Sequence, residues 1–403
     1  MKLTVERLGH LGDGVAPGPV FVPMALPGEV VEGDVTEGRI AAPKIVEPSP
    51  HRVKPVCPHY RACGGCALMH ASDGFVADWK VDVVRTALAA QGVDAPFRPV
   101  ITSAPQSRRR ATFSGRRTKK SALVGFHGRA SGTIIEVPGC RLLHPDLIAT
   151  LPHLAEVTMI GASRKGELAL TVTRTEGGAD LAVSGGKPLE QSLFSDLAKL
   201  AERAGLARLT WDGEPVANRY PAAQRFGQAI VVPPAGAFLQ ATAEGESALV
   251  AAVREAVVGS SRIADLFAGS GTFTLPLAEW AEVHAVEGEA AMLAALDAGW
   301  RQAQALHKVT TETRDLFRRP LMPDELNRFD AAVIDPPRAG GEAQTQELAA
   351  SNVLVIAAVS CNPVTFARDA RILNDAGYRI DWVQVVDQFR WSPHVELVAR
   401  FAR

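Results

Sequence analysis

The stretch Asp265-Leu266-Phe267-Ala268-Gly269-Ser270-Gly271-Thr272-Phe273 follows a short apolar run that begins near Arg262 and is typical of a turn from a buried strand into a helix. Gly269 and Gly271 allow the backbone to approach a ligand closely, and the start of the next helix offers free N–H groups to an anion. A third glycine at the dinucleotide spacing is missing, which favours S-adenosylmethionine over a nicotinamide cofactor. Glu287 follows about 20 residues later, where a carboxylate can accept hydrogen bonds from ribose hydroxyls.

Strand-like and helix-like segments alternate from about residue 238 onward. The expected strands lie at 262–266, 283–286, 309–313, 329–334 and 353–359, with two more at 381–386 and 395–401. This alternation predicts a mostly parallel, doubly wound sheet, a Rossmann-like α/β domain over residues 236–403.

A cysteine and a carboxylate are expected at one edge of that sheet. Cys361 lies in Ser360-Cys361-Asn362-Pro363, directly after an apolar strand, where open α/β sheets carry their chemistry. A helix expected after Pro363 should lower the pKa of the thiol through its dipole, although a strand-end cysteine can also be an inert small hydrophobe. Glu396 interrupts the apolar last strand, which can return beside the cysteine.

This pair suits methylation of a pyrimidine at carbon 5. That carbon is a weak nucleophile until a thiolate adds to carbon 6, and a base must afterwards remove the carbon 5 proton to release the thiol. The rigid loop Asp335-Pro336-Pro337-Arg338 ends another strand at the same edge.

Four further cysteines, Cys57, Cys63, Cys66 and Cys140, combine a Cys-x5-Cys-x2-Cys cluster with one distant partner. Disulfides are not expected in a cytosolic chain, and four thiolates suit either zinc or a [4Fe-4S] cluster. Structural zinc usually has two closely spaced pairs, whereas only Cys63 and Cys66 form one here, so the spacing favours iron–sulfur. Four unliganded thiols are the alternative.

The length of 403 residues, with 47% hydrophobic and 22% charged residues, predicts two or three domains with sizeable cores. Short β-type runs between Gly and Pro in residues 1–50 indicate a small OB-like barrel, and residues 51–235 are expected to form a β-rich central domain. An amphipathic helix at about 73–91 should pack on the catalytic domain.

The absence of a long apolar stretch or a signal peptide predicts a cytoplasmic protein with no membrane contact, and we expect a monomer.

Positive charge is concentrated in one part of a chain whose net charge is only -1. Between His51 and Pro145 there are 15 Lys and Arg against 5 Asp and Glu, and the densest stretch runs from Arg108 to Lys120 around Phe113. Such a mixture of cations with an aromatic indicates a surface that follows nucleic-acid phosphates, with a solvated basic hairpin as the alternative.

Together these motifs resemble the S-adenosylmethionine-dependent RNA uracil-C5 methyltransferases, most closely the branch that acts on 23S ribosomal RNA, over essentially the whole chain. The resemblance implies an N-terminal TRAM domain of OB type, a [4Fe-4S] cluster on the four cysteines, Cys361 as nucleophile and Glu396 as base. Relatives specific for tRNA generally lack the TRAM domain and the cluster, so both features point to 23S rRNA as the partner.

The resemblance also implies binding residues. Cofactor contacts fall on Gln240, Asp265, Phe267, Gly269, Gly271, Thr272, Glu287, Asp315 and Asp335. RNA contacts fall on Arg108, Arg109, Arg110, Phe113 and Arg338. Arg109 replaces the Asn that is usual in the family, and Thr272 stands where Asn is frequent, which puts these individual contacts in doubt.

Three other functions compete with this interpretation. The chain could methylate a tRNA uridine, or it could be an amino-group methyltransferase that uses the Asp-Pro-Pro-Arg loop and needs no cysteine. It could also be a non-catalytic RNA-binding protein that keeps the fold. The last two predict a function that is independent of Cys361.

Overall fold

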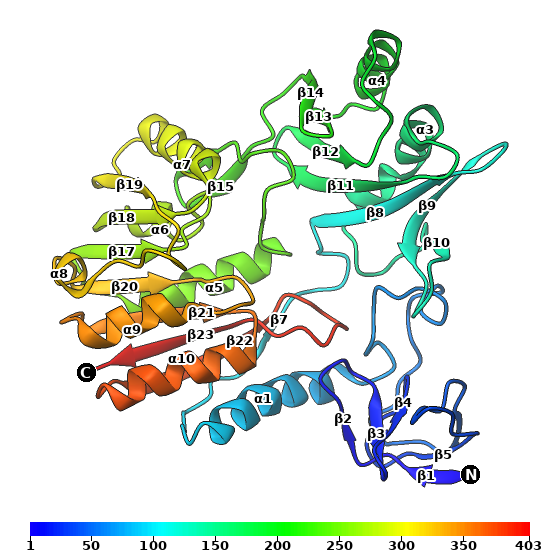
Figure 1. Cartoon of the computed structure of the whole chain (residues 1–403), viewed down its shortest axis with the longest axis horizontal. Coiled ribbons are helices and arrows are strands. Elements are labelled where there is room, and N and C mark those ends of the chain that lie inside the picture. The colour runs from blue at the N-terminus through cyan, green and yellow to red at the C-terminus, as the bar shows by residue number, and fades with distance from the viewer.

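The computed structural model describes residues 1–403, and the C-terminal half forms the expected doubly wound α/β sheet (Figure 1). Its eight strands lie in the order β19-β18-β17-β20-β21-β23-β22-β7. Their bounds are β7 (Ile101–Thr102), β17 (Arg262–Leu266), β18 (Glu282–Glu287), β19 (Val309–Thr313), β20 (Ala331–Ile334), β21 (Val355–Ser360), β22 (Arg379–Asp387) and β23 (Leu397–Ala402). The chain proceeds outward from β17 to β19 and then returns to β20, so the crevice between β17 and β20 is the switch point where such sheets bind ligands.

Strand β23 runs antiparallel to both of its neighbours, β21 and β22. Its beginning therefore lies at the same edge of the sheet as the ends of the parallel strands. This topology brings a residue just before β23 to the edge that carries the turns after β17, β20 and β21.

Helices cover both faces of the sheet, as its apolar strands require. One face carries α5 (Ala243–Ala256), α6 (Thr274–Leu277) and α7 (Ala290–Gln302), and the other carries α1 (Asp73–Ala90), α8 (Pro323–Leu326), α9 (Glu342–Ala350) and α10 (Pro363–Asp375). Helix α1 precedes the α/β segment in sequence by more than 150 residues, yet Val84 and Leu88 are buried with the residues of α10. None of the helices is both long and apolar enough to span a membrane.

The middle of the chain forms a seven-stranded sheet in the order β10-β9-β8-β11-β12-β13-β14. These strands are β8 (Arg110–Arg117), β9 (Ala122–His127), β10 (Ile134–Glu136), β11 (Glu167–Thr175), β12 (Gly178–Ser184), β13 (Arg208–Trp211) and β14 (Glu214–Asn218), and α2 (Pro145–Ala149), α3 (Leu151–Gly161) and α4 (Gln191–Arg203) accompany them. Gly161 is required here, because a Cβ atom would lie 2.0 Å from the buried ring of Trp211. The hairpin of β15 (Gln224–Phe226) and β16 (Ala229–Val231) leads into the α/β region.

The first 50 residues form two three-stranded sheets. One contains β1 (Lys2–Thr4), β5 (Val30–Glu32) and β6 (Lys44–Glu47), and the other contains β2 (Arg7–Leu8), β3 (Gly14–Ala16) and β4 (Val20–Val22). A small apolar core that includes Val22 and Val31 lies between them. The buried Glu29 accepts hydrogen bonds from the backbone of Leu26 and from Arg52, which ties this region to the segment that follows.

Candidate active site

The turn after β17 has the geometry of a ligand-binding loop. Phe267, Gly269 and Gly271 all have positive φ, at 64°, 55° and 95°. A Cβ atom at Gly271 would lie 2.8 Å from Leu296 of α7, whereas one at Gly269 would meet nothing within 4 Å. Gly271 is therefore needed for packing, and Gly269 leaves open space beside the backbone. Positive φ at Phe267 is unfavourable for a non-glycine residue, and such strain is concentrated at binding sites.

Two carboxylates lie beside this turn. Glu287 accepts hydrogen bonds from the backbone N–H groups of Gly269 and Glu289, both at 3.0 Å, which orients its carboxylate over the turn. Each oxygen keeps a lone pair for a hydroxyl group. Asp265 is fully buried, and one of its oxygens accepts from Thr274 while Oδ1 has no partner. Burial raises the pKa of Asp265 to about 7.

An unpartnered buried carboxylate oxygen needs a ligand to satisfy it. The open backbone at Gly269, the oriented carboxylate of Glu287 and the buried Asp265 fit S-adenosylmethionine, which carries a positive charge and ribose hydroxyls. These residues would hold the cofactor at the switch point of the sheet.

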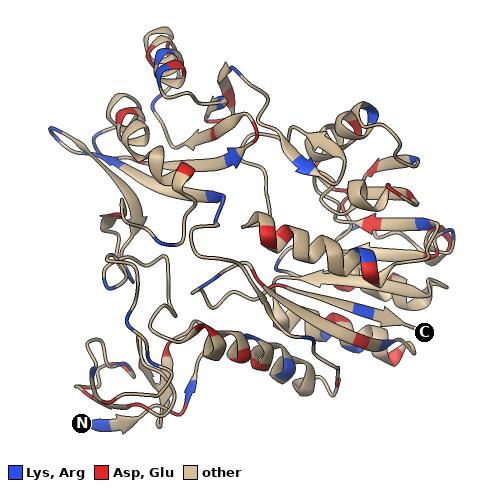
Figure 2. Ribbon diagram, turned by 180° about the vertical axis from the view of Figure 1, so that it is seen from behind, with Lys and Arg blue, Asp and Glu red and all other residues tan.

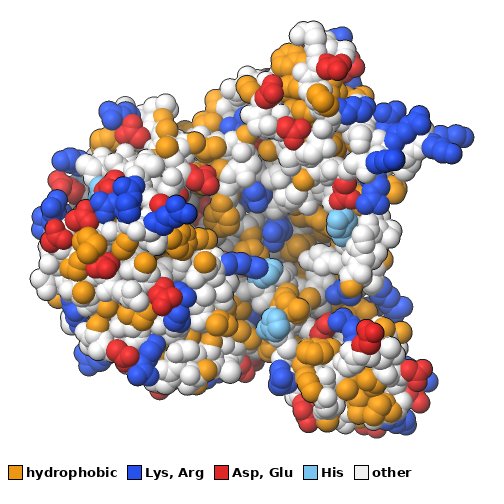
Figure 3. Space-filling view, viewed as in Figure 1, with side chains coloured by type: hydrophobic (Ala, Val, Ile, Leu, Met, Phe, Trp, Pro, Cys, Tyr) orange, Lys and Arg blue, Asp and Glu red, His pale blue; other side chains and the backbone are white.

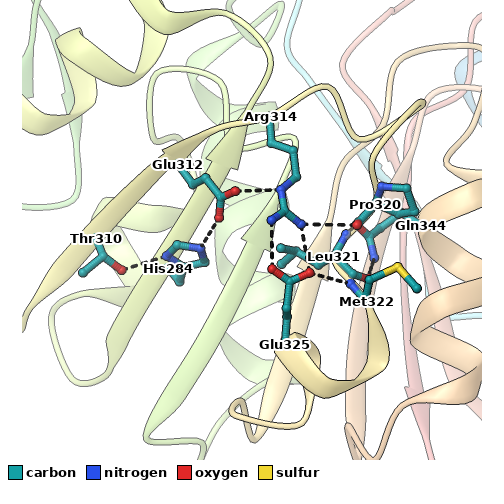
Figure 4. Close-up of polar contacts among 9 residues, drawn as sticks. All are labelled: His284, Thr310, Glu312, Arg314, Pro320, Leu321, Met322, Glu325 and Gln344. Carbon is teal, nitrogen blue, oxygen red and sulfur yellow. Dashed lines mark hydrogen bonds and ion pairs between the residues drawn. The ribbon is translucent and has the colours of Figure 1, made fainter.

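The loop after β19 is held by an ion-pair network (Figure 4). Arg314 forms a bidentate pair with Glu325, with distances of 2.8 Å and 3.0 Å, and its Nε donates to Glu312 at 2.6 Å. The side-chain amide of Gln344 from α9 makes two hydrogen bonds with the backbone of Leu321. Hydrogen bonds from Arg314 lower the pKa of Glu325 to about 2.

This network positions the loop next to the cofactor turn. The backbone N–H of Arg314 donates to the carbonyl of Glu287, the last residue of β18, at 2.9 Å. Asp315, the next residue, therefore lies close to the end of β18. Two residues later the exposed ring of Phe317 lies 5.4 Å from the ring of Phe267. Sequence reasoning missed Phe317, although an exposed aromatic residue two positions after Asp315 was a signal that could have found it.

Cys361 and Glu396 come from neighbouring strands. Ser360, the last residue of β21, pairs with Leu397, the first residue of β23, so the next residue pair in this register is Cys361 opposite Glu396. Glu396 is 3% exposed, while Cys361 is partly accessible. Both side chains therefore lie at the edge that carries the cofactor turn.

The thiol does not have the low pKa that the sequence led us to expect. Helix α10 does begin directly after Asn362, but the pKa of Cys361 is raised to about 11, first by burial and then by the carboxylates of Glu396 and Asp335, against the opposing effect of Arg338. The prediction of a helix-lowered pKa is wrong because these two carboxylates and the loss of solvent favour the neutral thiol. Burial likewise raises the pKa of Glu396, and the nearby Asp335 adds to this rise.

The Asp-Pro-Pro-Arg loop lies against the cysteine loop. The backbone N–H of Asp335 donates to Leu266 at the end of β17, and Asn362 donates its side-chain amide to the carbonyl of Arg338 at 2.8 Å. The exposed guanidinium of Arg338 donates to Nδ1 of His394 at 2.6 Å. The three loops after β17, β20 and β21 are thus joined by hydrogen bonds.

Gln240 is 2% exposed, and its Oε1 accepts a hydrogen bond of 2.5 Å from Gln388. The same Gln388 amide donates to Glu396 at 3.2 Å, so Gln240 is connected to the expected base. Sequence reasoning missed Gln388, and no motif marks it. Thr272 lies in the same turn as Gly271 and is partly buried.

Two of the residues expected to contact RNA are structural. Arg109 is 8% exposed and pairs with Glu246 at 2.5 Å, while its Nε donates to the carbonyl of Gln240 at 3.1 Å. Phe113 is fully buried and stacks on Phe126. Burial of both side chains opposes the predicted RNA contacts of Arg109, which immediately precedes β8, and of Phe113, which lies within β8.

Other cations of this segment are accessible. Arg108 and Arg110 are partly exposed and line a cavity in the middle of the molecule, where Figure 3 shows a hollow with Lys or Arg and His side chains in its floor. Exposed Lys and Arg side chains also gather at the tip of the β8–β9 hairpin, among them Arg116, Lys119 and Lys120 (Figures 2 and 3).

The four remaining cysteines line the same cavity as Arg108 and Arg110, which has a volume of about 340 Å³. The sulfur of Cys63 accepts a hydrogen bond from Gly65, and that of Cys140 accepts one from Leu142. The pKa of Cys66 is raised to about 12, first by burial and then by the other three cysteines. No three Cys, His, Asp or Glu side chains lie close enough together to hold a metal ion. The cavity is nevertheless lined by four cysteine sulfurs, two of which accept N–H hydrogen bonds, and cysteine sulfur is the donor type that iron–sulfur clusters require.

Comparisons with known proteins agree with this site. A family model described as tRNA (Uracil-5-)-methyltransferase matches residues 197–401. An uncharacterized RNA methyltransferase of Brucella suis biovar 1 is 45% identical over 401 residues, which cover 99% of this chain and 97% of that protein. The 23S rRNA (uracil(1939)-C(5))-methyltransferase RlmD of Nitrosococcus oceani is 32% identical over 99% of this chain and 95% of its own length.

Among solved structures, the tRNA (uracil-54, C5)-methyltransferase of Pyrococcus abyssi in complex with S-adenosyl-L-homocysteine matches with a TM-score of 0.77 and 22% identity, covering 100% of this chain and 99% of that one. The fold and the relatives are those of an S-adenosylmethionine-dependent methyltransferase. The chain belongs to the tRNA (Uracil-5-)-methyltransferase family, whose members are RNA uracil-C5 methyltransferases.

Proposed function

We propose that the protein transfers a methyl group to carbon 5 of a specific uridine in 23S rRNA, with Cys361 as covalent nucleophile and Glu396 as base. The observation that carries this proposal is the cross-strand placement of Cys361 and Glu396 beside the cofactor turn. S-adenosylmethionine supplies the methyl group when it is bound.

The chain's own residues account for the remaining steps. The thiol of Cys361 loses its proton to water, and the sulfur adds to carbon 6 of the uracil, which moves the electrons of the ring double bond toward carbon 5 and the C4 carbonyl. Carbon 5 then forms the new bond to the methyl group, whose bond to the sulfonium sulfur would break and leave S-adenosylhomocysteine. Glu396 removes the proton that remains on carbon 5, the double bond forms again and the C–S bond breaks, which returns the thiolate.

The ionisation of the two groups follows from their neighbours. The raised pKa of Cys361 means that the thiol is protonated in the ligand-free protein, so it is protected from oxidation until substrate arrives. Arg338 is the cation next to the thiol, and it favours the thiolate. A cationic cofactor beside Asp335 would partly neutralise the carboxylates that oppose ionisation of the cysteine.

Ribosomal RNA is the favoured substrate for two reasons. The Nitrosococcus relative that acts on 23S rRNA aligns with nearly the whole chain. The four-cysteine cavity and the N-terminal β region are present as well, and we propose that they form a [4Fe-4S] site and an RNA-binding TRAM barrel, with zinc as the less favoured metal. A tRNA uridine is the second candidate, because the description of the family model names tRNA.

We propose a division into residues 1–50, 51–235 and 236–403, with RNA held between the N-terminal barrel, the basic hairpin and the catalytic region. The target base must leave its stack to reach Cys361, at a cost of a few kcal/mol. We propose that Arg108 and Arg110, which are partly exposed, and the exposed Arg338 contact the RNA. We further propose that the chain acts as a monomer in the cytoplasm.

The decisive experiment incubates the protein with methyl-labelled cofactor and separate pools of unmodified 23S rRNA and tRNA, and then identifies the labelled nucleoside and its position. We expect 5-methyluridine in 23S rRNA. Label in tRNA would support the second candidate, and full activity of a Cys361→Ala variant would reject the covalent route. Glu396→Gln is expected to accumulate a protein–RNA adduct that survives denaturing electrophoresis.

A further inference from the structure

Both ends of the Gln388 side-chain amide form hydrogen bonds within the site. Gln388 follows β22 and is 1% exposed. Its Nε2 donates to Oε1 of Gln240 at 2.5 Å and to Oε2 of Glu396 at 3.2 Å. Its Oε1 accepts from the backbone N–H of Ala241 at 2.7 Å. This one amide therefore connects the expected base with Gln240.

The backbone contact determines which end of each amide faces which neighbour. The N–H of Ala241 can only donate, so the end of the Gln388 amide that faces it must be the carbonyl oxygen. The NH₂ end of Gln388 must then face the other two partners. Gln240 in turn has to present its own oxygen to Gln388, which directs its NH₂ group the opposite way.

Two polar atoms of this hydrogen-bonded group have no partner: one NH₂ donor and one carboxylate oxygen. Nε2 of Gln240 and Oε1 of Glu396 have no hydrogen-bond partner within the chain. Both side chains are almost fully buried, but these two atoms remain accessible to solvent. A buried polar atom without a partner is costly unless something binds to it. These two atoms are therefore available to a bound ligand, which for Gln240 would be the target base and not the cofactor that the family resemblance implies.

We propose that Gln388 is a positioning residue that orients Gln240 and Glu396, so that the site presents one fixed NH₂ donor and one free carboxylate oxygen to the target base. This inference rests on the proposed function. Uracil carries a carbonyl acceptor at carbon 4, whereas cytosine carries an amino donor there. A fixed NH₂ donor favours binding of uracil and opposes binding of cytosine. Gln388 therefore contributes indirectly to the selectivity for uracil.

Two buried ion pairs fix the backbone segments that contact Gln388. Lys80 pairs with Asp387, the residue before Gln388, at 2.5 Å. Arg109 pairs with Glu246 and also binds the backbone of both Gln240 and Ala241. Buried ion pairs add little net stability compared with apolar residues, but they can hold one specific arrangement. Their position on both sides of Gln388 agrees with such a role.

The test compares Gln388→Leu with Gln384→Leu. Gln384 lies four residues earlier, within β22, and is also buried, but its amide donates to the carbonyls of Pro99 and Val385 and not to the site. Methyl transfer is measured against pH on a uridine target and on the same RNA with cytidine at that position. Melting temperature and cofactor binding show whether each variant is folded.

We expect Gln388→Leu to lower the rate at least tenfold at neutral pH and to move the rising limb of the pH–rate curve to higher pH, because Glu396 loses the donor that favours its ionised form. The preference for uridine over cytidine should fall at least fivefold. Gln384→Leu should match the wild type in both measurements. Gln388→Glu preserves the size of the side chain and serves as a second variant if the leucine variant does not fold; its carboxylate should repel Glu396 and shift the limb further.

Unchanged pH dependence and base preference in a folded Gln388 variant would overturn the inference. Equal changes in the Gln384→Leu variant would also overturn it, because they would show a general packing effect. A wild-type protein that methylates no uridine would instead reject the proposed function, so the two failures can be told apart.

Discussion

Lys80 and Asp387 form an ion pair of 2.5 Å whose side chains are 0% and 2% exposed, although 307 residues separate them in sequence. Lys80 comes from α1 and Asp387 is the last residue of β22, so the pair joins the segment before the central sheet to the start of the loop that leads to Glu396. Nζ of Lys80 also donates to the carbonyl of Phe389 in that loop. Burial lowers the pKa of Lys80, and Asp387 opposes this effect.

Replacing Lys80 alone should therefore be strongly destabilising. Lys80→Met leaves Asp387 buried without a partner, and we expect a loss of about 3–5 kcal/mol in the free energy of unfolding, measured by urea denaturation. The double variant Lys80→Met, Asp387→Leu should recover most of this loss. Arg85→Met on the exposed face of the same helix is the control and should change stability by no more than about 0.5 kcal/mol. A small effect of Lys80→Met would show that the pair does not fasten α1.

The stability of the ligand-free protein should fall as pH rises from about 4 to about 7. The pKa of the buried Asp265 is raised from its ordinary value to about 7, so the folded state keeps a proton that the unfolded state has already lost. Ionising this group therefore favours unfolding. In Asp265→Asn, the fall in the free energy of unfolding between about pH 4 and about pH 7 should be smaller by roughly a few kcal/mol. Urea denaturation at several pH values measures this difference. An unchanged slope would mean that Asp265 is solvated in solution.

Cofactor affinity should depend on Arg314 although it lies outside the glycine turn. Arg314→Lys loses the bidentate contact with Glu325 and loosens the loop that carries Asp315 and Phe317. We expect the dissociation constant for S-adenosylmethionine to rise about threefold to tenfold, a coupling of roughly 1 kcal/mol, measured by titration calorimetry. Arg301→Lys on α7, whose side chain is 68% exposed and pairs with Asp297, is the control and should bind normally.

The four-cysteine cavity should hold iron. Protein purified without oxygen is expected to contain about four iron and four sulfide ions per chain and to absorb broadly in the visible range. Cys66→Ser should lose most of this iron, whereas Cys361→Ser should retain it because Cys361 does not line the cavity. One zinc ion and no iron would show that the ligands are correct and the metal is wrong.

The tip of the β8–β9 hairpin should contribute to RNA affinity through charge alone. The double variant Lys119→Ala, Lys120→Ala should weaken RNA binding and reduce the slope of log K against log salt by about 0.7 for each lost phosphate contact. Lys199→Ala, Arg203→Ala on α4 is the control with the same loss of charge. Equal slopes for the two variants would exclude a specific contact at the hairpin.

Much of the α/β region could be predicted from short stretches of sequence. The strands at Arg262–Leu266 and Val309–Thr313 have the bounds that their apolar runs predict, and Cys361 lies at the end of β21 as expected. These features depend on local periodicity and turn chemistry, which operate over a few residues. The family resemblance drawn from the same motifs is confirmed by the relatives.

Side-chain environment was decided only by tertiary structure. Arg109 lies in a basic stretch but is neutralised by Glu246, 137 residues away, and Phe113 faces a core that no local pattern reveals. The pKa of Cys361 is governed by burial and by carboxylates from other strands, not by its own helix. The sequence by itself determined the strands, the turns and the placement of Cys361 at a strand end, because these are local properties of the chain. Charge state and orientation in the site, including that of Gln388, arise from contacts between distant segments and exist only once the chain has folded.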